Sequence, residues 1–125
     1  MNIPADLNYT SDHEWARLEG GSITVGLTDF AQGELGDIIF VEFPRVGDSF
    51  AQGDVFGTVE AVKTVADLFM PLSGEITAIN AHLEDAPEEV NSDAYGAGWL
   101  VKIKFSNPAE RDGLLDAAAY KALIA

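Results

Sequence analysis

The sequence predicts a single, mainly β domain with one C-terminal helix, and three observations carry this prediction. The length of 125 residues corresponds to one domain, which buries roughly two-thirds of its unfolded surface without disulfide bonds. Apolar residues follow strand-like spacing in most of the chain, and sustained helical spacing is confined to the last segment. The 47% hydrophobic content separates the chain from disordered acidic tails.

The first predicted element is a hairpin over residues 15–27. The pair Gly20-Gly21 separates two apolar segments and supplies the positive φ angles that a two-residue turn requires. Pairing outward from this turn places Leu18 opposite Ile23 on one face. The register and the hydrophobic pattern therefore agree.

Three shorter elements follow. Residues 29–36 predict one helical turn, capped by Asp29 and stopped by Gly36. Residues 38–43 are nearly continuously apolar, as in a buried strand, and Pro44 ends them. Residues 101–105 alternate between apolar and polar, which is typical of a strand with one wet face.

The last predicted element is a helix over residues 108–124. Asn107 offers a cap side chain, Pro108 occupies the first helical position, and Glu110 stands three residues past the cap. The predicted apolar stripe of this helix consists of Leu114, Leu115, Ala118, Ala122 and Leu123.

The composition excludes several classes of function. The chain has 21 acidic and 7 basic residues, a net charge of −14, and would repel nucleic acid. It has no cysteine, which excludes disulfides, thiolate metal sites and a cysteine nucleophile. No apolar run approaches the roughly 18 residues of a membrane span, and residues 1–4 do not resemble a signal peptide.

Lys63 is the only cation between Arg45 and Lys102, a stretch that holds ten acidic residues. Pairing outward from Val62-Lys63 places Glu60 opposite Val65, so that the lysine sits at the tip of a hairpin. Neither tip residue is favoured in a primed two-residue turn, so either another turn type or a functional constraint applies. Taken alone, such a lysine is most often a plain exposed residue.

The chemistry of the tip favours a modified lysine over a catalytic one. At an ordinary pKa near 10.4, only roughly one lysine in a thousand is neutral at physiological pH. Acidic neighbours favour the charged form further. Three hypotheses stay open at this point, namely a carrier that presents Lys63 to another enzyme, a lysine-dependent enzyme, and an inert acidic interaction module.

Glycine–acid pairs at Gly47, Gly53 and Gly74 add a faint duplication that suggests two similar half-sheets.

The segment Glu60-Ala61-Val62-Lys63, with Ala66-Asp67 and residues 71–76 after it, resembles the lipoyl attachment site of the glycine cleavage system H protein family. Residues 9–15 are similar to the N-terminal signature of that family. Biotin carriers usually have Met-Lys-Met at the tip and dehydrogenase lipoyl domains Asp-Lys-Ala, and Val62-Lys63 matches neither. The family commonly has serine at the positions of Ala61 and Ala66. The similarity continues through Val25-Gly26-Leu27-Thr28, Ala31, Leu35-Gly36-Asp37-Ile38, Phe40-Val41-Glu42, Pro44, Val46-Gly47, Asn80, Leu83, Pro87, Val90-Asn91, Tyr95, Gly98-Trp99 and Asn107-Pro108.

The resemblance implies a fold, which is a lipoyl/biotinyl-type flattened β-barrel, or sandwich of two half-sheets, with short helical turns and one C-terminal helix. Residues 1–125 are expected to form a single lipoyl-carrier domain. Its parts are an N-terminal hairpin at about 14–28, a lipoyl hairpin at about 54–71 and a C-terminal helix at about 108–124.

The resemblance also implies a function, which is to carry lipoate covalently on Lys63 and to shuttle the aminomethyl group of glycine. The implied partners are glycine decarboxylase (P protein), aminomethyltransferase (T protein), dihydrolipoamide dehydrogenase (L protein), and a lipoate ligase or octanoyltransferase. The protein itself is expected to be a monomeric carrier and not an enzyme. The alternatives are a lipoyl relay or storage protein for other complexes and a biotinyl carrier. A bacterial cytoplasmic location is expected, or the mitochondrial matrix for a processed organelle form.

The loaded arm ends in an amine, so a groove that holds it is expected to offer a carboxylate. By resemblance the candidates are Glu14 and Asp67, followed by Asp12; the alternative for Glu14 is closure of a capping box with Ser11. No metal ligand set is recognisable. His13 is expected to be structural and His82 to lie on the surface.

Overall fold

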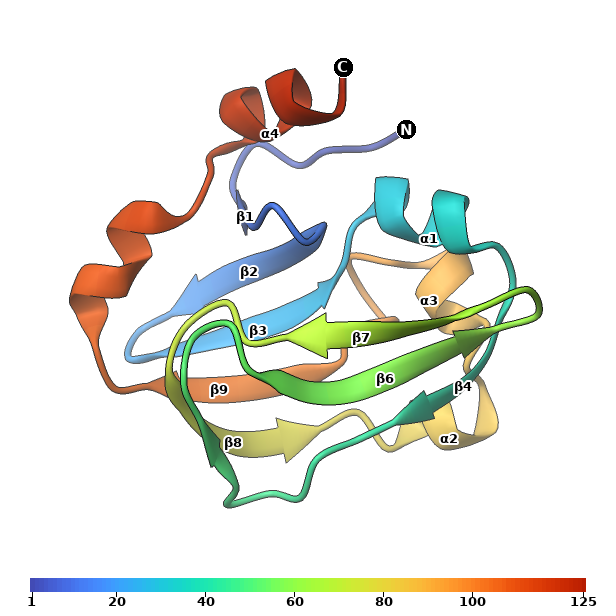
Figure 1. The fold of residues 1–125 in the computed structure, drawn as a ribbon, viewed down its shortest axis with the longest axis horizontal. Coiled ribbons are helices and arrows are strands. Elements are labelled where there is room, and N and C mark those ends of the chain that lie inside the picture. The colour runs from blue at the N-terminus through green and yellow to red at the C-terminus, as the bar shows by residue number, and fades with distance from the viewer.

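The computed structural model describes residues 1–125, and its strands form two antiparallel sheets (Figure 1). The six-stranded sheet has the order β1-β2-β3-β9-β8-β5, and the three-stranded sheet has the order β4-β6-β7. The strands of the larger sheet are Asn8–Tyr9 (β1), Glu14–Glu19 (β2), Ser22–Leu27 (β3), Val101–Phe105 (β9), Gly74–Ile79 (β8) and Ser49–Phe50 (β5). Those of the smaller sheet are Ile38–Glu42 (β4), Val55–Ala61 (β6) and Val65–Phe69 (β7).

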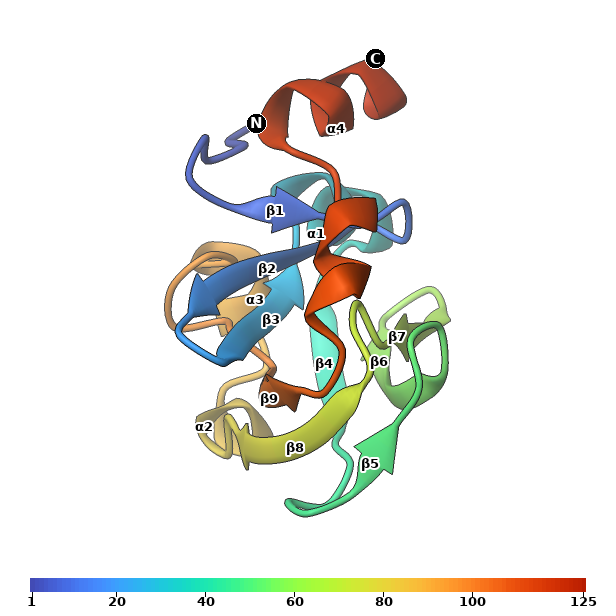
Figure 2. The same ribbon diagram turned by 90° about the vertical axis from the view of Figure 1, so that its left-hand side faces the viewer.

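Short helices connect and flank the sheets. They are α1 (Asp29–Leu35), α2 (His82–Asp85), α3 (Glu89–Ser92), the 3-10 helix η1 (Pro108–Gly113) and α4 (Ala117–Ile124). None of them is long and apolar enough to cross a membrane. Figure 2 shows α4 beside β1, at the end of the molecule that lies away from β5.

A core of 19 buried residues lies between the two sheets. The larger sheet contributes residues such as Ile23 and Ile103, and the smaller sheet contributes Val59 and Leu68. A second cluster of five buried residues attaches α4 to the larger sheet. It consists of Leu7, Tyr9, Trp15, Ala117 and Tyr120.

The predicted fold class, a flattened β sandwich with short helices, is confirmed, and so is the register of the N-terminal hairpin, in which Leu18 pairs with Ile23. The two sheets are, however, not similar halves, because β1 and the β2–β3 hairpin extend only one of them. Of the three glycine–acid pairs, Gly47-Asp48 and Gly53-Asp54 form similar turns. In both, the aspartate accepts a hydrogen bond from the backbone N–H three residues earlier, Asp48 from Arg45 and Asp54 from Ala51. Gly74 lies instead within β8.

Two local predictions need correction. The cap of α1 is Thr28 and not Asp29, because the Thr28 hydroxyl accepts the hydrogen bond from the Ala31 N–H. The strand at residues 38–42 is not buried on both faces, since it lies at the edge of the smaller sheet and exposes Ile39 and Phe40.

The C-terminal region forms two helical segments rather than one. Asn107 caps η1 as predicted, but Leu114 adopts an extended conformation and Leu115 pairs with Tyr9. Asp116 then caps the new helix α4. This restart changes the helical phase, so the buried residues of α4 are Ala117 and Tyr120, whereas the predicted stripe residues Ala118, Ala122 and Leu123 are exposed.

The carboxylate of Glu110 also differs from its predicted role. It does not cap its own helix but accepts hydrogen bonds at 2.9 Å from both the backbone N–H and the hydroxyl of Ser73. This contact ties η1 to the start of β8.

Candidate functional site

The β6–β7 hairpin places Lys63 at an exposed tip that projects from the body of the molecule (Figure 1). Its register is the predicted one, with Glu60 opposite Val65. The Ala61 N–H donates to the Thr64 carbonyl at 2.8 Å, which closes the hairpin beneath the tip. The Val62 N–H donates to the Asp37 carbonyl at 3.1 Å and joins the tip to the segment before β4.

The turn at the tip is not of a primed type. Primed turns require a positive φ at one or both central residues, and neither Val62 nor Lys63 has one. This removes the conflict with residue preferences noted in the sequence. In the segment Glu60-Ala61-Val62-Lys63, which resembles a lipoyl attachment site, Ala61 is buried in the core, whereas Glu60, Val62 and Lys63 are exposed. The motif therefore combines one anchoring side chain with three that a partner can reach.

A small pocket lies between α1 and β7, at the free edge of the sheet that carries Lys63. It encloses about 170 Å³, and most of the residues that line it are hydrophobic. Its polar lining residues are Asp12, His13, Glu34 and Asp67, and its apolar ones are Leu27, Ala31, Leu35, Val59, Ala66 and Leu68. Of the three carboxylate candidates from the sequence, the structure brings Asp12 and Asp67 into this pocket.

Glu14, the remaining candidate, does not line the pocket and is buried, with 1% of its surface exposed. One carboxyl oxygen accepts the Phe69 N–H at 2.7 Å, and the other lies 3.4 Å from the Thr10 hydroxyl. Burial raises its pKa to about 8, and the charge of Asp12 adds to this shift, while the two hydrogen bonds oppose it. The capping box is also absent, because Glu14 begins β2 rather than a helix.

His13 forms part of the pocket wall in an unusual backbone conformation. Its φ of 67° is the only positive φ outside the glycines. Its Nδ1 lies 3.0 Å from the Tyr120 hydroxyl, which in turn lies 2.8 Å from the Thr28 hydroxyl. The prediction that His13 is structural is confirmed by these contacts, and His82 lies on the surface as predicted.

Sequence reasoning missed Tyr120 and Glu34. The prediction of one continuous C-terminal helix placed other residues on the buried face, and Tyr120 was therefore not recognised as a buried residue. Its only signal was the spacing from Asp116, an alternative helix cap four residues earlier. Glu34 lines the pocket from α1, and nothing in its sequence context distinguishes it from other exposed helix acids.

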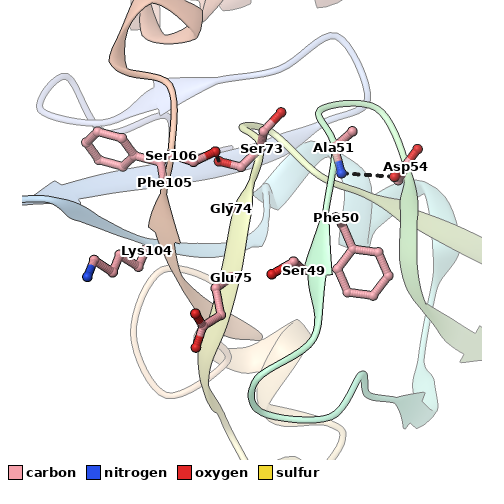
Figure 3. Close-up of a pocket in the computed structure, with 10 residues that line it drawn as sticks. All are labelled: Ser49, Phe50, Ala51, Asp54, Ser73, Gly74, Glu75, Lys104, Phe105 and Ser106. Carbon is pink, nitrogen blue, oxygen red and sulfur yellow. Dashed lines mark hydrogen bonds between the residues drawn. The ribbon is translucent and has the colours of Figure 1, made fainter.

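A larger, open pocket of about 550 Å³ lies where β5, β8 and β9 meet (Figure 3). Most of the residues that line it are polar, and Glu75 and Lys104 stand opposite each other on β8 and β9. Asp54, the residue before β6, lies on its rim. This places the pocket at the opposite end of β6 from Lys63, so it takes no part in the lysine site.

Two packed antiparallel sheets, with a single exposed lysine at the turn between two neighbouring strands, define a carrier domain of the lipoyl/biotinyl type. The sequence profile described as "Glycine cleavage H-protein" matches residues 7–125. A glycine cleavage system H protein of Salinibacter ruber is 58% identical over 120 residues, which cover 96% of this chain and 97% of the relative. That of Bacteroides fragilis is 53% identical over 124 residues, with 99% and 98% covered. The chain therefore belongs to the glycine cleavage H-protein family.

A solved structure agrees with this assignment. The crystal structure of a glycine cleavage system H protein from Mycobacterium marinum superposes with a TM-score of 0.85 at 39% sequence identity. The match covers 96% of this chain and 97% of that protein. The similarity therefore extends over both sheets and the helices that flank them.

Proposed function

We propose that Lys63 is the attachment point of a lipoyl group, held by an amide bond to Nζ. Membership of the family makes the chain a lipoyl carrier of the glycine cleavage system. The observation that supports Lys63 as the attachment point is its position at an exposed tip, on a hairpin whose other face is anchored in the core by Val59, Ala61 and Leu68. A rigid base with an accessible amine suits a lysine that other enzymes modify and use.

When bound, the lipoyl group supplies a dithiolane that accepts the aminomethyl group of glycine. In this proposal, glycine decarboxylase loads the arm, aminomethyltransferase unloads it, and dihydrolipoamide dehydrogenase reoxidises it. The chain itself catalyses none of these steps and acts as their shared substrate. The bacterial relatives support a bacterial cytoplasmic location.

The pocket between α1 and β7 is proposed as the resting place of the loaded arm. Burying about eight arm carbons at about 0.8 kcal/mol each gives an upper limit near 6 kcal/mol, from which the lost freedom of the arm is subtracted. Asp67 and Asp12 offer carboxylates to the amine at the end of the arm. Glu14 acts indirectly in this proposal, because its hydrogen bond to the Phe69 N–H holds the end of β7 in place.

The attachment reaction itself is acyl transfer. The deprotonated Nζ attacks the carbonyl carbon of an activated lipoyl group, such as a lipoyl adenylate. The new carbon–nitrogen bond forms as the bond to the leaving group breaks, so that AMP leaves and the amine loses a proton. Because the amide is neutral, the net charge changes from −14 to −15.

Intact mass spectrometry after incubation with a lipoate ligase, lipoate and ATP tests the attachment point. We expect one lipoyl adduct on the wild-type chain, none on Lys63→Arg, and a normal adduct on the control Lys104→Arg, which changes another exposed lysine in the same way. The adduct is also expected to shift the isoelectric point to lower pH. An adduct that persists in Lys63→Arg contradicts the proposal.

A further inference from the structure

The face of the smaller sheet that points away from the core carries an unusual group of exposed apolar residues around the tip. Nine large hydrophobic side chains of the molecule are exposed, and four of them lie at this end. Ile39 is 50% exposed, Phe40 51%, Val62 69% and Val65 58%. A group of this kind on an otherwise acidic protein marks a contact surface. We call these four residues the tip patch.

Strand pairing places two residues of the tip patch, Phe40 and Val65, in one row across the sheet. Phe40 on β4 pairs with Glu60 on β6, and Glu60 pairs with Val65 on β7, so that the three side chains form one row across the sheet. Val62 follows at the tip, next to Lys63. In Figure 1 this sheet lies in front of the larger one, with the tip at its right-hand end, and the core lies behind it.

A β-bulge creates the patch on β4. The register between β4 and β6 shifts between Ile38 and Phe40, which leaves Ile39 as an extra residue. Regular alternation would turn one of the two neighbours Ile39 and Phe40 inward, whereas the bulge exposes both and still buries Ile38 and Val41. Two consecutive apolar side chains are thus held in water at an edge strand, a position that proteins usually protect with charges.

Carboxylates border the patch. Glu60 lies between Phe40 and Val65, and Glu42 follows Phe40 on β4 with an exposed side chain. Phe40 also borders a hollow of about 370 Å³ whose lining includes Glu42 and Glu84. A complementary surface therefore needs an apolar spot flanked by lysine or arginine side chains, whose long stems suit the hollow.

We propose that the tip patch is the docking surface for the enzyme that acylates Lys63, and that this enzyme presents an apolar spot bordered by basic residues. The inference rests on the proposed attachment at Lys63. An enzyme that transfers an acyl group to Nζ must cover the residues around the lysine, and these are the residues that the bulge and the tip expose.

The test measures the rate of adduct formation by a lipoate ligase over a range of concentrations of the full-length unmodified chain, with lipoate and ATP saturating. We expect Phe40→Ser and Val65→Ser each to raise KM about tenfold and to leave kcat within twofold, because hot-spot residues act mainly on binding. Leu123→Ser removes a side chain that is equally exposed (50%) but lies on α4, and should change neither constant. Unfolding curves of all variants check that the fold is retained.

Charge is tested separately. Glu60→Gln and Glu42→Gln are expected to raise KM severalfold at low salt and to reduce its dependence on salt, since screening weakens exposed ion pairs.

An unchanged KM in Phe40→Ser and Val65→Ser overturns the docking surface, even where Lys63→Arg still abolishes the adduct. A wild-type chain that dimerises through Phe40, seen by sedimentation and lost in Phe40→Ser, also overturns it, because a second copy is then the occupant. Absence of any adduct on the wild type contradicts the attachment at Lys63 itself.

Discussion

Tyr120 on α4 lies with its hydroxyl 3.0 Å from Nδ1 of His13, the residue with the positive φ in the pocket wall. The same hydroxyl lies 2.8 Å from the hydroxyl of Thr28, which caps α1. One phenol thus connects two parts of the pocket, the turn before β2 and the helix that faces β7. The ring is fixed by stacking on Tyr9, with centroids 4.7 Å apart and planes at 9°. The C-terminal helix therefore holds the pocket in shape without lining it.

Tyr120→Phe is expected to destabilise the protein by about 1–2 kcal/mol, because the buried hydroxyl of Thr28 and the ring of His13 lose a hydrogen-bond partner. The ring stacking is retained, so the fold should persist. The lipoylated and loaded variant should lose its aminomethyl group faster than the wild type, as followed by intact mass over time. Tyr95→Phe is the matched control, since its hydroxyl also makes two hydrogen bonds but does not contact His13. Equal acceleration by both variants contradicts a specific role of Tyr120.

Glu14 should make stability depend on pH in a defined window. Its pKa is raised from an ordinary value of 4.5 to about 8, so the folded state holds a proton that the unfolded chain has released. Its contribution is complete below pH 4.5 and is lost as the pH rises to about 8, by up to about 1.4 kcal/mol per pH unit. Glu14→Gln keeps an acceptor for the Phe69 N–H but cannot ionise.

The measurement is the free energy of unfolding of both proteins, by urea denaturation between pH 4 and pH 9. Relative to the wild type, Glu14→Gln should gain stability as the pH rises through this window and show little further gain above it. Taking the difference removes the titration of groups that both proteins share. A difference that stays constant with pH contradicts an ionisable, buried Glu14.

The two hairpins and their registers could be predicted from the sequence because the side chains of a strand point alternately to its two faces. Residues that are close in the chain therefore decide which register buries the apolar side chains. Once the turns at Gly20-Gly21 and Val62-Lys63 are placed, the facing residues follow, and the buried and exposed faces agree with the apolar pattern. Lys63 stood out from the sequence as a lone cation among ten acidic residues, and its assignment as an attachment point rested on the resemblance to the family. These features depend on neighbours in the chain.

Features that depend on distant contacts could not be predicted. Glu14 and Phe69 are 55 residues apart, and only the packing of the two sheets brings the carboxyl group to the end of β7. The bulge at Ile39 has no sequence signal in an apolar run that reads equally well as a buried strand. The break before α4 follows from the pairing of Leu115 with Tyr9, a contact between the two ends of the chain.

Asp67 lies on the hairpin that carries Lys63, and it lines the pocket. Its replacement by asparagine should therefore affect only the loaded arm. Asp67→Asn is expected to be lipoylated at the normal rate but to lose the aminomethyl group about two- to fivefold faster, the effect of an exposed ion pair of up to about 1 kcal/mol. Glu60→Gln is the control for the loss rate alone, because Glu60 is on the same hairpin and does not line the pocket. The difference should shrink in high salt. A loss rate of Asp67→Asn equal to that of wild type shows that the amine is held elsewhere.

Replacing Gly57 and Gly33 by alanine should change the stability of the protein in opposite directions. At Gly57 on β6, an added Cβ meets the carbonyl oxygen of Glu42 on β4, so Gly57→Ala must separate the two strands and should destabilise the protein by about 1–3 kcal/mol. At Gly33 in α1, an added Cβ meets nothing within 4 Å, and Gly33→Ala should stabilise the helix by about 0.5–1 kcal/mol.

Thermal unfolding shows whether each variant is less or more stable than the wild type. Because β4 supports the hairpin from one side, Gly57→Ala should also slow acylation of Lys63, whereas Gly33→Ala should leave it unchanged. If Gly57→Ala is stable and fully acylated, then the β4–β6 pairing does not position the lysine, and the hairpin is held by β7 and the core alone.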